Sequence, residues 1–161
     1  MDPFSTHLPV LAACVAKTEG PILELGSGNY STLMLHHVCK VTQRQLVTVD
    51  WDETWFESVK SCLSPQDWHT VILAKMDGIE HIPVIMGTDW SVVFVDHWPS
   101  WNRRLDLPKM ADIADLIVAH DSSQEDLGLT PVFDTFKYQF TWKVKHPWTT
   151  VVSNRIPIDF L

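Results

Sequence analysis

Five short apolar runs recur along this chain, and each is followed within a few residues by glycines, acids or histidines. The runs occupy residues 22–25, 46–49, 70–73, 92–95 and 116–119, and the third is separated from its Asp77-Gly78 pair by residues 74–76. Stretches with a helical spacing of apolar residues separate them, and such alternation is typical of a mostly parallel sheet with helices on both faces. The fourth run contains no polar residue, as expected for a strand that is buried on both sides. We therefore expect an α/β fold.

Helix-start signals stand before two of the helical stretches. Residues 5–17 have apolar residues at helical spacing, and Ser5 or Thr6 is the expected N-cap. Thr54 followed by Glu57 has the spacing of a capping box, so we expect a second helix to start there.

The C-terminal part of the chain has the pattern of a hairpin. Residues 138–144 and 149–153 are strand-like and are joined through His146 and Pro147. We expect them to form an antiparallel pair at one edge of the sheet. No repeat or linker interrupts the sequence, so residues 1–161 are expected to form a single domain.

Composition excludes several classes of protein. The net charge of −8 disfavours a surface that neutralises nucleic acid, so we expect no nucleic-acid partner. Three cysteines are too few for a disulfide framework and favour a reducing compartment. The chain starts without the charged and apolar regions of a signal peptide, and no apolar run is long enough for a membrane span. We expect a cytoplasmic protein without a membrane partner.

Polar residues gather after each apolar run, at the ends where an α/β sheet binds its ligand. Loops are polar in most proteins, so any single cluster is weak support for a ligand site. Five clusters at equivalent positions after five strands are stronger support. The clusters are Gly26-Ser27-Gly28-Asn29, Asp50-Trp51-Asp52, Asp77-Gly78, Asp96-His97 and His120-Asp121-Ser122.

The first two clusters together indicate a nucleoside cofactor. Gly26 and Gly28 allow a sharp turn and a close approach of a ligand to the backbone. Ser31 occupies the third position of a dinucleotide-binding glycine motif, which weakens the case for a diphosphate. Asp50 follows Gly28 by 22 residues (50 minus 28), at the end of the next strand, where a carboxylate accepts both hydroxyls of a ribose.

Residues 22–31 resemble the first motif of class I S-adenosylmethionine-dependent methyltransferases. Asp50 matches the acid that this family places at the ribose, and Asp77-Gly78 matches its adenine-side loop. The resemblance implies S-adenosylmethionine as cofactor and a Rossmann-like, seven-stranded sheet with a reversed edge hairpin. It implies cofactor contacts at Glu24, Gly26, Ser27, Gly28, Tyr30, Ser31, Asp50, Trp51, Asp77, Gly78, Asp96, His97 and Trp98.

The segment Asp96-His97-Trp98 is similar to a motif of the catechol O-methyltransferase family, which binds Mg²⁺ beside the acceptor hydroxyl. Asp96 matches the first metal ligand and Asp121 the second, with Ser122 where that family has Asn. An alignment shifted by one residue makes His120 and Asp121 the pair. The resemblance therefore implies Mg²⁺ at Asp96, His120 and Asp121, and an imidazole ligand would shift the preference toward Mn²⁺ or Fe²⁺. The alternative without a metal is that Asp96 positions the cofactor and Asp121 caps a helix.

The chain departs from that family at the catalytic base. Pro99 stands where the family has lysine, and a proline side chain cannot exchange a proton. His97 is the substitute with a suitable ordinary pKa, whereas Arg103 or Arg104 can only stabilise an anion. Few residues precede the first strand, so we expect the acceptor pocket to be open or covered by a second subunit.

Aromatic residues near the predicted site have two interpretations. Trp98 and Trp101 stand near Asp96 and Trp51 stands beside Asp50, so these three are candidates to line the adenine and the acceptor. Core packing is the expectation for four others, namely Trp55, Trp68, Trp90 and Trp142. The pair His36-His37 is expected to face solvent.

The predicted function is methyl transfer from S-adenosylmethionine to a small-molecule acceptor, most simply a hydroxyl, with Asp96, His97 and Asp121 as the catalytic residues. One alternative is a non-catalytic cofactor-binding or assembly protein that kept the fold after losing the base. Another is a metal-dependent enzyme of different chemistry, but it leaves the glycine loop and Asp50 unexplained.

Overall fold

The computed structural model describes residues 2–75 and 78–161, which form a seven-stranded sheet in the order β3-β2-β1-β4-β5-β7-β6. Strands β1 to β5 are parallel, and β7 pairs antiparallel with both β5 and β6. The parallel sheet and its reversed edge hairpin confirm the predicted fold class. The strands are β1 Ile22–Leu25, β2 Leu46–Asp50, β3 His69–Leu73, β4 Trp90–Val95, β5 Ala114–Ala119, β6 Tyr138–Trp142 and β7 Thr149–Ser153.

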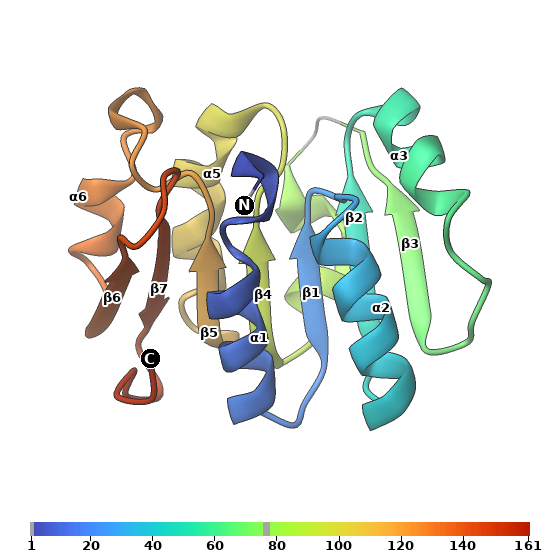
Figure 1. Cartoon of the computed structure of the whole chain (residues 1–161), viewed down its shortest axis with the longest axis horizontal. Helices are drawn as coiled ribbons and strands as arrows, with labels where there is room; N and C mark the ends of the chain where they lie inside the picture. Colours follow the sequence, from blue (N-terminus) through green and yellow to red (C-terminus); the bar gives the residue numbers. More distant parts are fainter. Residues whose placement is uncertain (1, 76–77) are drawn as a thin grey trace.

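Helices cover both faces of this sheet (Figure 1). Two long helices, α1 and α2, pack side by side on one face, and short helical segments cover the other. The α-helices are α1 Leu8–Lys17, α2 Ser31–Thr42, α3 Glu53–Lys60, α4 Pro83–Met86, α5 Arg103–Asp106 and α6 Thr130–Phe133. The 3₁₀ segments are η1 Pro3–Ser5, η2 Ile79–His81, η3 Ser100–Asn102, η4 Leu107–Met110 and η5 Glu125–Leu127.

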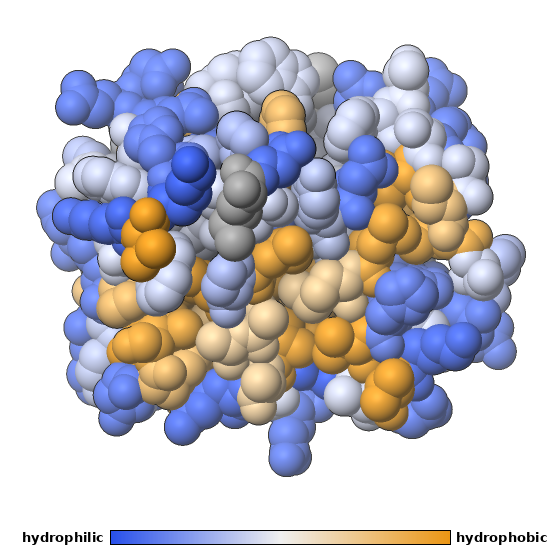
Figure 2. Space-filling model, viewed as in Figure 1, coloured by the Kyte–Doolittle hydropathy of each residue, from blue (hydrophilic) through white to orange (hydrophobic). Residues whose placement is uncertain are grey.

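The strands divide the apolar core into two layers because successive side chains of a strand point to opposite faces. On β4, Val92 and Phe94 pack beneath α1 and α2, whereas Val93 and Val95 pack under the short helices. Figure 2 shows apolar residues over α1 and α2, below a more hydrophilic edge at the carboxyl ends of the strands. None of the described helices is long and apolar enough to cross a bilayer.

The two predicted helix starts are both displaced. The first helix begins at Leu8 instead of near Ser5, because residues 3–5 form η1 and Thr6 turns its hydroxyl into the interior. The N-cap of α3 is Asp52, whose carboxylate accepts from the Trp55 amide at 2.8 Å. An aspartate two residues earlier therefore caps the helix in place of the predicted capping box at Thr54.

Two predictions about aromatic residues are wrong. Trp55 is 44% exposed and lies at the strand ends, because α3 turns Phe56 and Val59 toward the core instead. His36 is buried, with its Nδ1 2.9 Å from Nδ1 of His69. Trp90 is buried as predicted.

Candidate active site

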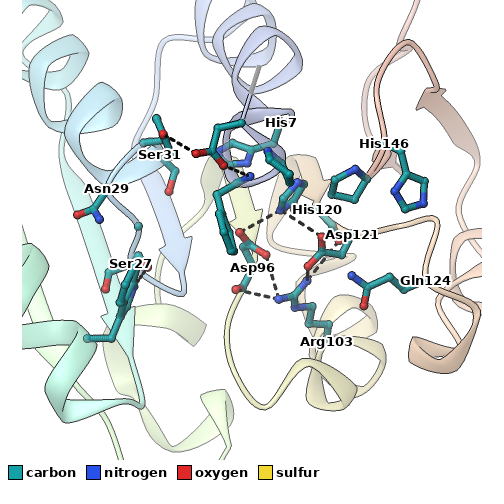
Figure 3. Close-up of a pocket in the computed structure, with 17 residues that line it drawn as sticks. His7, Ser27, Asn29, Ser31, Asp96, Arg103, His120, Asp121, Gln124 and His146 are labelled. Carbon is teal, nitrogen blue, oxygen red and sulfur yellow. Dashed lines mark hydrogen bonds and ion pairs between the residues drawn. The ribbon is translucent and has the colours of Figure 1, made fainter.

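A cavity of about 750 Å³ opens at the carboxyl ends of the strands (Figure 3). The glycine loop lines one end, the residues after β4 and β5 line the other, and the N-terminal segment lines a further wall. A second cavity of about 310 Å³ lies beside it, next to Asp50 and Asp52. Ser27, Trp55 and Asp96 line both cavities, so the two are neighbours at these side chains.

The N-terminal segment supplies part of the cover for which we expected a second subunit. Asp2, Pro3 and Phe4 line the larger cavity. The Tyr30 hydroxyl donates to Asp2 Oδ2 at 3.1 Å and ties the segment to the glycine loop.

The glycine loop packs directly against the end of β4. Gly26 has φ +94, in the region that favours glycine, and its amide donates to the Val49 carbonyl at 2.8 Å. A Cβ at Gly26 would lie 2.5 Å from the Cα of His97. Only glycine fits here, so the predicted requirement for small residues has a structural cause in addition to ligand access.

Asp50 fastens the glycine loop to the end of β2. Its Oδ1 accepts from the amides of Trp51 at 2.7 Å and Asp52 at 3.0 Å. Its Oδ2 accepts from the amide of Ser27 at 2.8 Å and also from the Ser27 hydroxyl. These four bonds use the carboxylate's usual accepting capacity, so a ribose hydroxyl would have to displace one of them.

Glu24 lies beneath the loop in β1 and lines neither cavity. It is fully buried, and its Oε2 accepts from the Thr48 hydroxyl at 2.8 Å, while Oε1 has no hydrogen-bond partner. Burial raises the pKa of this carboxyl to about 7, although hydroxyls nearby oppose the shift.

Arg103 joins the residues after β4 and β5. Its guanidinium, 5% exposed, contacts Asp96 Oδ1 at 2.9 Å and Asp121 Oδ2 at 3.0 Å. Its other contacts go to backbone carbonyls, namely those of Asp96 at 3.0 Å, His97 at 3.0 Å and His120 at 3.4 Å. Four hydrogen bonds and the ion pair with Asp96 Oδ1 thus hold the guanidinium, and Arg103 acts as a clamp between the two strand ends.

Asp121 turns the chain sharply after β5. Its φ of 56 is in the left-handed region, which aspartate tolerates better than most residues. The turn directs one carboxylate oxygen toward Arg103 and leaves Oδ1 3.6 Å from Nδ1 of His120.

His120 stands between Thr6 and Asp96. Its Nε2 lies 3.0 Å from the Thr6 hydroxyl, and its Nδ1 lies 3.2 Å from Asp96 Oδ2. Burial opposes ionisation of Asp96, but the hydrogen bond to His120 and the charge of Arg103 together hold its pKa below the ordinary value.

His7 is a residue that the sequence-based prediction missed. Its ring is 2% exposed, packs 4.6 Å from the ring of His120 between centroids, and has no hydrogen-bond partner on either nitrogen. Burial lowers its pKa to about 4, so the ring is neutral at pH 7. No local pattern marks His7, because only the folded path of the N-terminal segment brings it to the strand ends.

His97 lines neither cavity. It is 1% exposed, its Nε2 lies 3.1 Å from Asp106 Oδ2, and its ring packs 4.9 Å from that of Trp51. The Trp51 indole donates to the Lys75 carbonyl at 3.0 Å. This placement does not support the prediction that His97 is the proton acceptor.

The other predicted site residues divide between the cavities. Ser27, Gly28, Tyr30 and Ser31 line the larger one, and Trp98, 67% exposed, lines the smaller. Gly78 follows β3 with φ +87. Asp77 lies outside the described residues.

The fold is shared with solved methyltransferase structures. Human methyltransferase-like protein 13, solved in complex with S-adenosylhomocysteine (SAH), is 16% identical with a TM-score of 0.67 over 96% of this chain and 84% of that one. This chain has the class I methyltransferase fold. No protein-family model matches the sequence, and no curated protein matches it.

Other proteins with this methyltransferase fold act on different acceptors. A Klebsiella pneumoniae protein assigned provisionally as an O-methyltransferase is 15% identical, with a TM-score of 0.67 over 93% of this chain and 78% of that one. An RNA methyltransferase from Salinibacter ruber, solved with SAH, is 14% identical, with a TM-score of 0.56 over 95% of this chain and 96% of that one. The fold alone therefore leaves the acceptor open.

Proposed function

We propose that this protein is an S-adenosylmethionine-dependent methyltransferase that acts on a hydroxyl of a small molecule. The observation that carries the proposal is one cavity of about 750 Å³ with the glycine loop at one end and a group of acids and histidines at the other. This arrangement places a cofactor and an acceptor side by side, and methyl transfer needs little more than that alignment.

The cofactor's amino-acid part fits against the loop of Ser27, Gly28 and Ser31, and its adenosine fits the smaller cavity beside Asp50 and Trp98. Ribose binding at Asp50 requires the Ser27 hydroxyl to turn away, since that bond is the one made by a mobile side chain. When bound, S-adenosylmethionine supplies an electrophilic methyl group on a sulfonium.

The acceptor hydroxyl would meet Asp96 at the far end of the cavity. Asp96 is ionised at neutral pH and keeps Oδ2 outside the Arg103 clamp, so it is the proton acceptor in this proposal. Arg103 and Asp121 act by holding Asp96 in place. These contacts take over the role of the lysine that Pro99 replaces.

The predicted magnesium site is the part of the sequence-based prediction that these contacts do not support. Arg103 engages one oxygen of Asp96 and one of Asp121, so the two carboxylates already share a cation. The remaining atoms are one oxygen from each acid with an imidazole nitrogen between them, a set that suits Mn²⁺ better than Mg²⁺.

A small molecule is favoured over nucleic acid as the acceptor by charge. The net charge of −8 opposes the approach of a phosphate backbone, and acids line the acceptor end of the cavity. The N-terminal segment along the cavity wall also limits the size of an acceptor.

The proposal is tested in two steps. Calorimetric titration should show that SAH binds the wild-type protein at one site. Product formation is then measured with diols, carboxylates and amines, with and without EDTA, and turnover of hydroxyl acceptors is expected. Binding of SAH without turnover of any acceptor would instead favour a non-catalytic cofactor-binding protein. That interpretation follows from Pro99, which stands where the related family has its lysine base. Failure to bind SAH would refute both.

A further inference from the structure

Three potential metal ligands from distant parts of the chain meet at the acceptor end of the cavity. One nitrogen each of His7 and His120 and one oxygen of Asp96 lie within 4.8 Å of one another. His7 precedes α1, Asp96 follows β4 and His120 follows β5, and Figure 3 shows their side chains turned toward one another.

Two groups hold the His120 ring from opposite sides. The Thr6 hydroxyl lies 3.0 Å from Nε2, and it also lies 2.9 Å from the Pro147 carbonyl and 3.3 Å from the Pro3 carbonyl. When the hydroxyl donates to one of these carbonyls, it can accept a hydrogen bond from Nε2. In that tautomer Nδ1 presents its lone pair toward Asp96.

In that tautomer Nδ1 and two carboxylate oxygens form a small group of acceptors. Asp96 Oδ2 lies 3.2 Å from Nδ1, and Asp121 Oδ1 lies 3.6 Å from it. A metal ion among these atoms would attract all three, whereas without an ion the other tautomer lets Nδ1 donate a hydrogen bond to Asp96. The contact between Nδ1 and Oδ2 has the length of an edge between two ligands of one ion with bonds of about 2.1 Å.

His7 is the independent sign that a ligand belongs here. It is 2% exposed, and neither ring nitrogen has a hydrogen-bond partner. Buried polar atoms are almost always satisfied, so an unpartnered imidazole that faces a carboxylate and a second imidazole points to an unmet bond.

We propose that His7, Asp96 and His120 bind a divalent transition-metal ion. Two imidazoles and one carboxylate with an open side suit Zn²⁺, Mn²⁺ or Fe²⁺, whereas Mg²⁺ prefers oxygen ligands throughout. Thr6 on His120 and Arg103 on Asp96 orient two of the ligands from outside, as second partners do in known metal sites.

The open side of this site faces the cavity that we assign to the acceptor. An acceptor hydroxyl on the ion would lose its proton more readily, and the ion would then replace Asp96 as the activating group. This catalytic use rests on the proposed function, but binding of the ion does not. The two are therefore tested apart.

The experiment uses the full chain after removal of metals with a chelator. Calorimetric titration with Zn²⁺ and with Mn²⁺ is expected to show one ion per chain. His7→Gln and His120→Gln are each expected to weaken binding by at least about tenfold. His81→Gln, which changes an exposed histidine, is the matched control and should leave affinity unchanged.

Two further measurements keep the result interpretable. Circular dichroism shows whether each variant is folded, and the SAH affinity of each variant shows whether the cofactor end of the cavity is intact. Wild-type protein that binds SAH but neither ion would overturn the metal site and leave the transferase in place. Equal metal affinity in the His7→Gln and His81→Gln variants would also overturn it. Metal binding without SAH binding would refute the transferase and keep the site.

Discussion

Ser27 donates two hydrogen bonds to one oxygen of Asp50, one from its amide and one from its hydroxyl. Asp50, the acid predicted to bind ribose, thus already holds the glycine loop in place. This aspartate is only 2% exposed. Cofactor binding and loop structure therefore compete for the same carboxylate.

Substitutions at these two positions should have opposite effects. Ser27→Ala removes the hydroxyl that a ribose must displace, so we expect SAH affinity equal to or above that of the wild type. Asp50→Asn puts an amide donor among four donors and should lower SAH affinity at least tenfold and stability by about 1–3 kcal/mol. Calorimetry and urea unfolding measure both, with exposed Asp67→Asn as the control. Tighter binding by Asp50→Asn would contradict the assignment.

Arg103 should matter far more for stability than its neighbour Arg104. Arg103→Ala leaves two carboxylates and three carbonyls without their donor, and we expect the free energy of unfolding to fall by about 3–5 kcal/mol. Arg104 is exposed, so Arg104→Ala should change the free energy of unfolding by less than about 0.5 kcal/mol. Arg103→Lys should lie between them, because an ammonium has three donors where the guanidinium has five. Equal losses for Arg103→Ala and Arg104→Ala in urea unfolding would refute the clamp.

The sheet and the position of the cavity were predictable because both follow from local pattern. Apolar runs buried on both faces, such as Val92 to Val95, mark parallel strands, and the carboxyl ends of parallel strands meet at one edge. The glycine loop and Asp50 were found in this way. The hydrogen bonds between the glycine loop and Asp50 were not predicted, because residue spacing within each element does not indicate which side chains of the two elements bind one another.

The acceptor end was only partly predictable because it depends on contacts between distant residues. Thr6 and His120 are 114 residues apart and meet only when the N-terminal segment crosses the strand ends. His7 carries no motif, and the sequence did not distinguish Arg103 from Arg104 as a residue that could stabilise an anion, because the contacts of Arg103 form only in the fold. Trp55 was misplaced because the exact start of α3 decides which side of that helix faces the core.

Trp55 should report cofactor binding. Its indole donates to the Ser27 carbonyl at 2.5 Å and lines both cavities, so a ligand that spans them must move it. We expect SAH to change the intrinsic fluorescence of the wild type and to change that of Trp55→Phe much less. Trp142→Phe, a substitution in β6 away from the cavities, should keep the wild-type response. A full response from Trp55→Phe would show that the indole stays outside the ligand path.

Glu24 should make stability fall as the pH rises. Burial raises its pKa in the folded protein to about 7, from the ordinary value of 4.5 that applies after unfolding. Below pH 4.5 the carboxyl is protonated in both states, so it imposes no penalty. Between these values the unfolded state has lost its proton while the folded state retains it, so each pH unit favours unfolding by about 1.4 kcal/mol. Above pH 7 the penalty is complete.

Glu24→Gln removes this penalty, because the amide resembles the protonated carboxyl and is never charged. We expect Glu24→Gln to raise the free energy of unfolding at pH 8 by about 3–3.5 kcal/mol relative to the wild type, and to have little effect at pH 4.5. Urea unfolding at both pH values measures the difference, and subtraction of the two proteins removes the contribution of the buried histidines. Exposed Glu57→Gln should show no such dependence. A gain from Glu24→Gln that is the same at both pH values would mean that Glu24 titrates normally, and the raised pKa would be refuted.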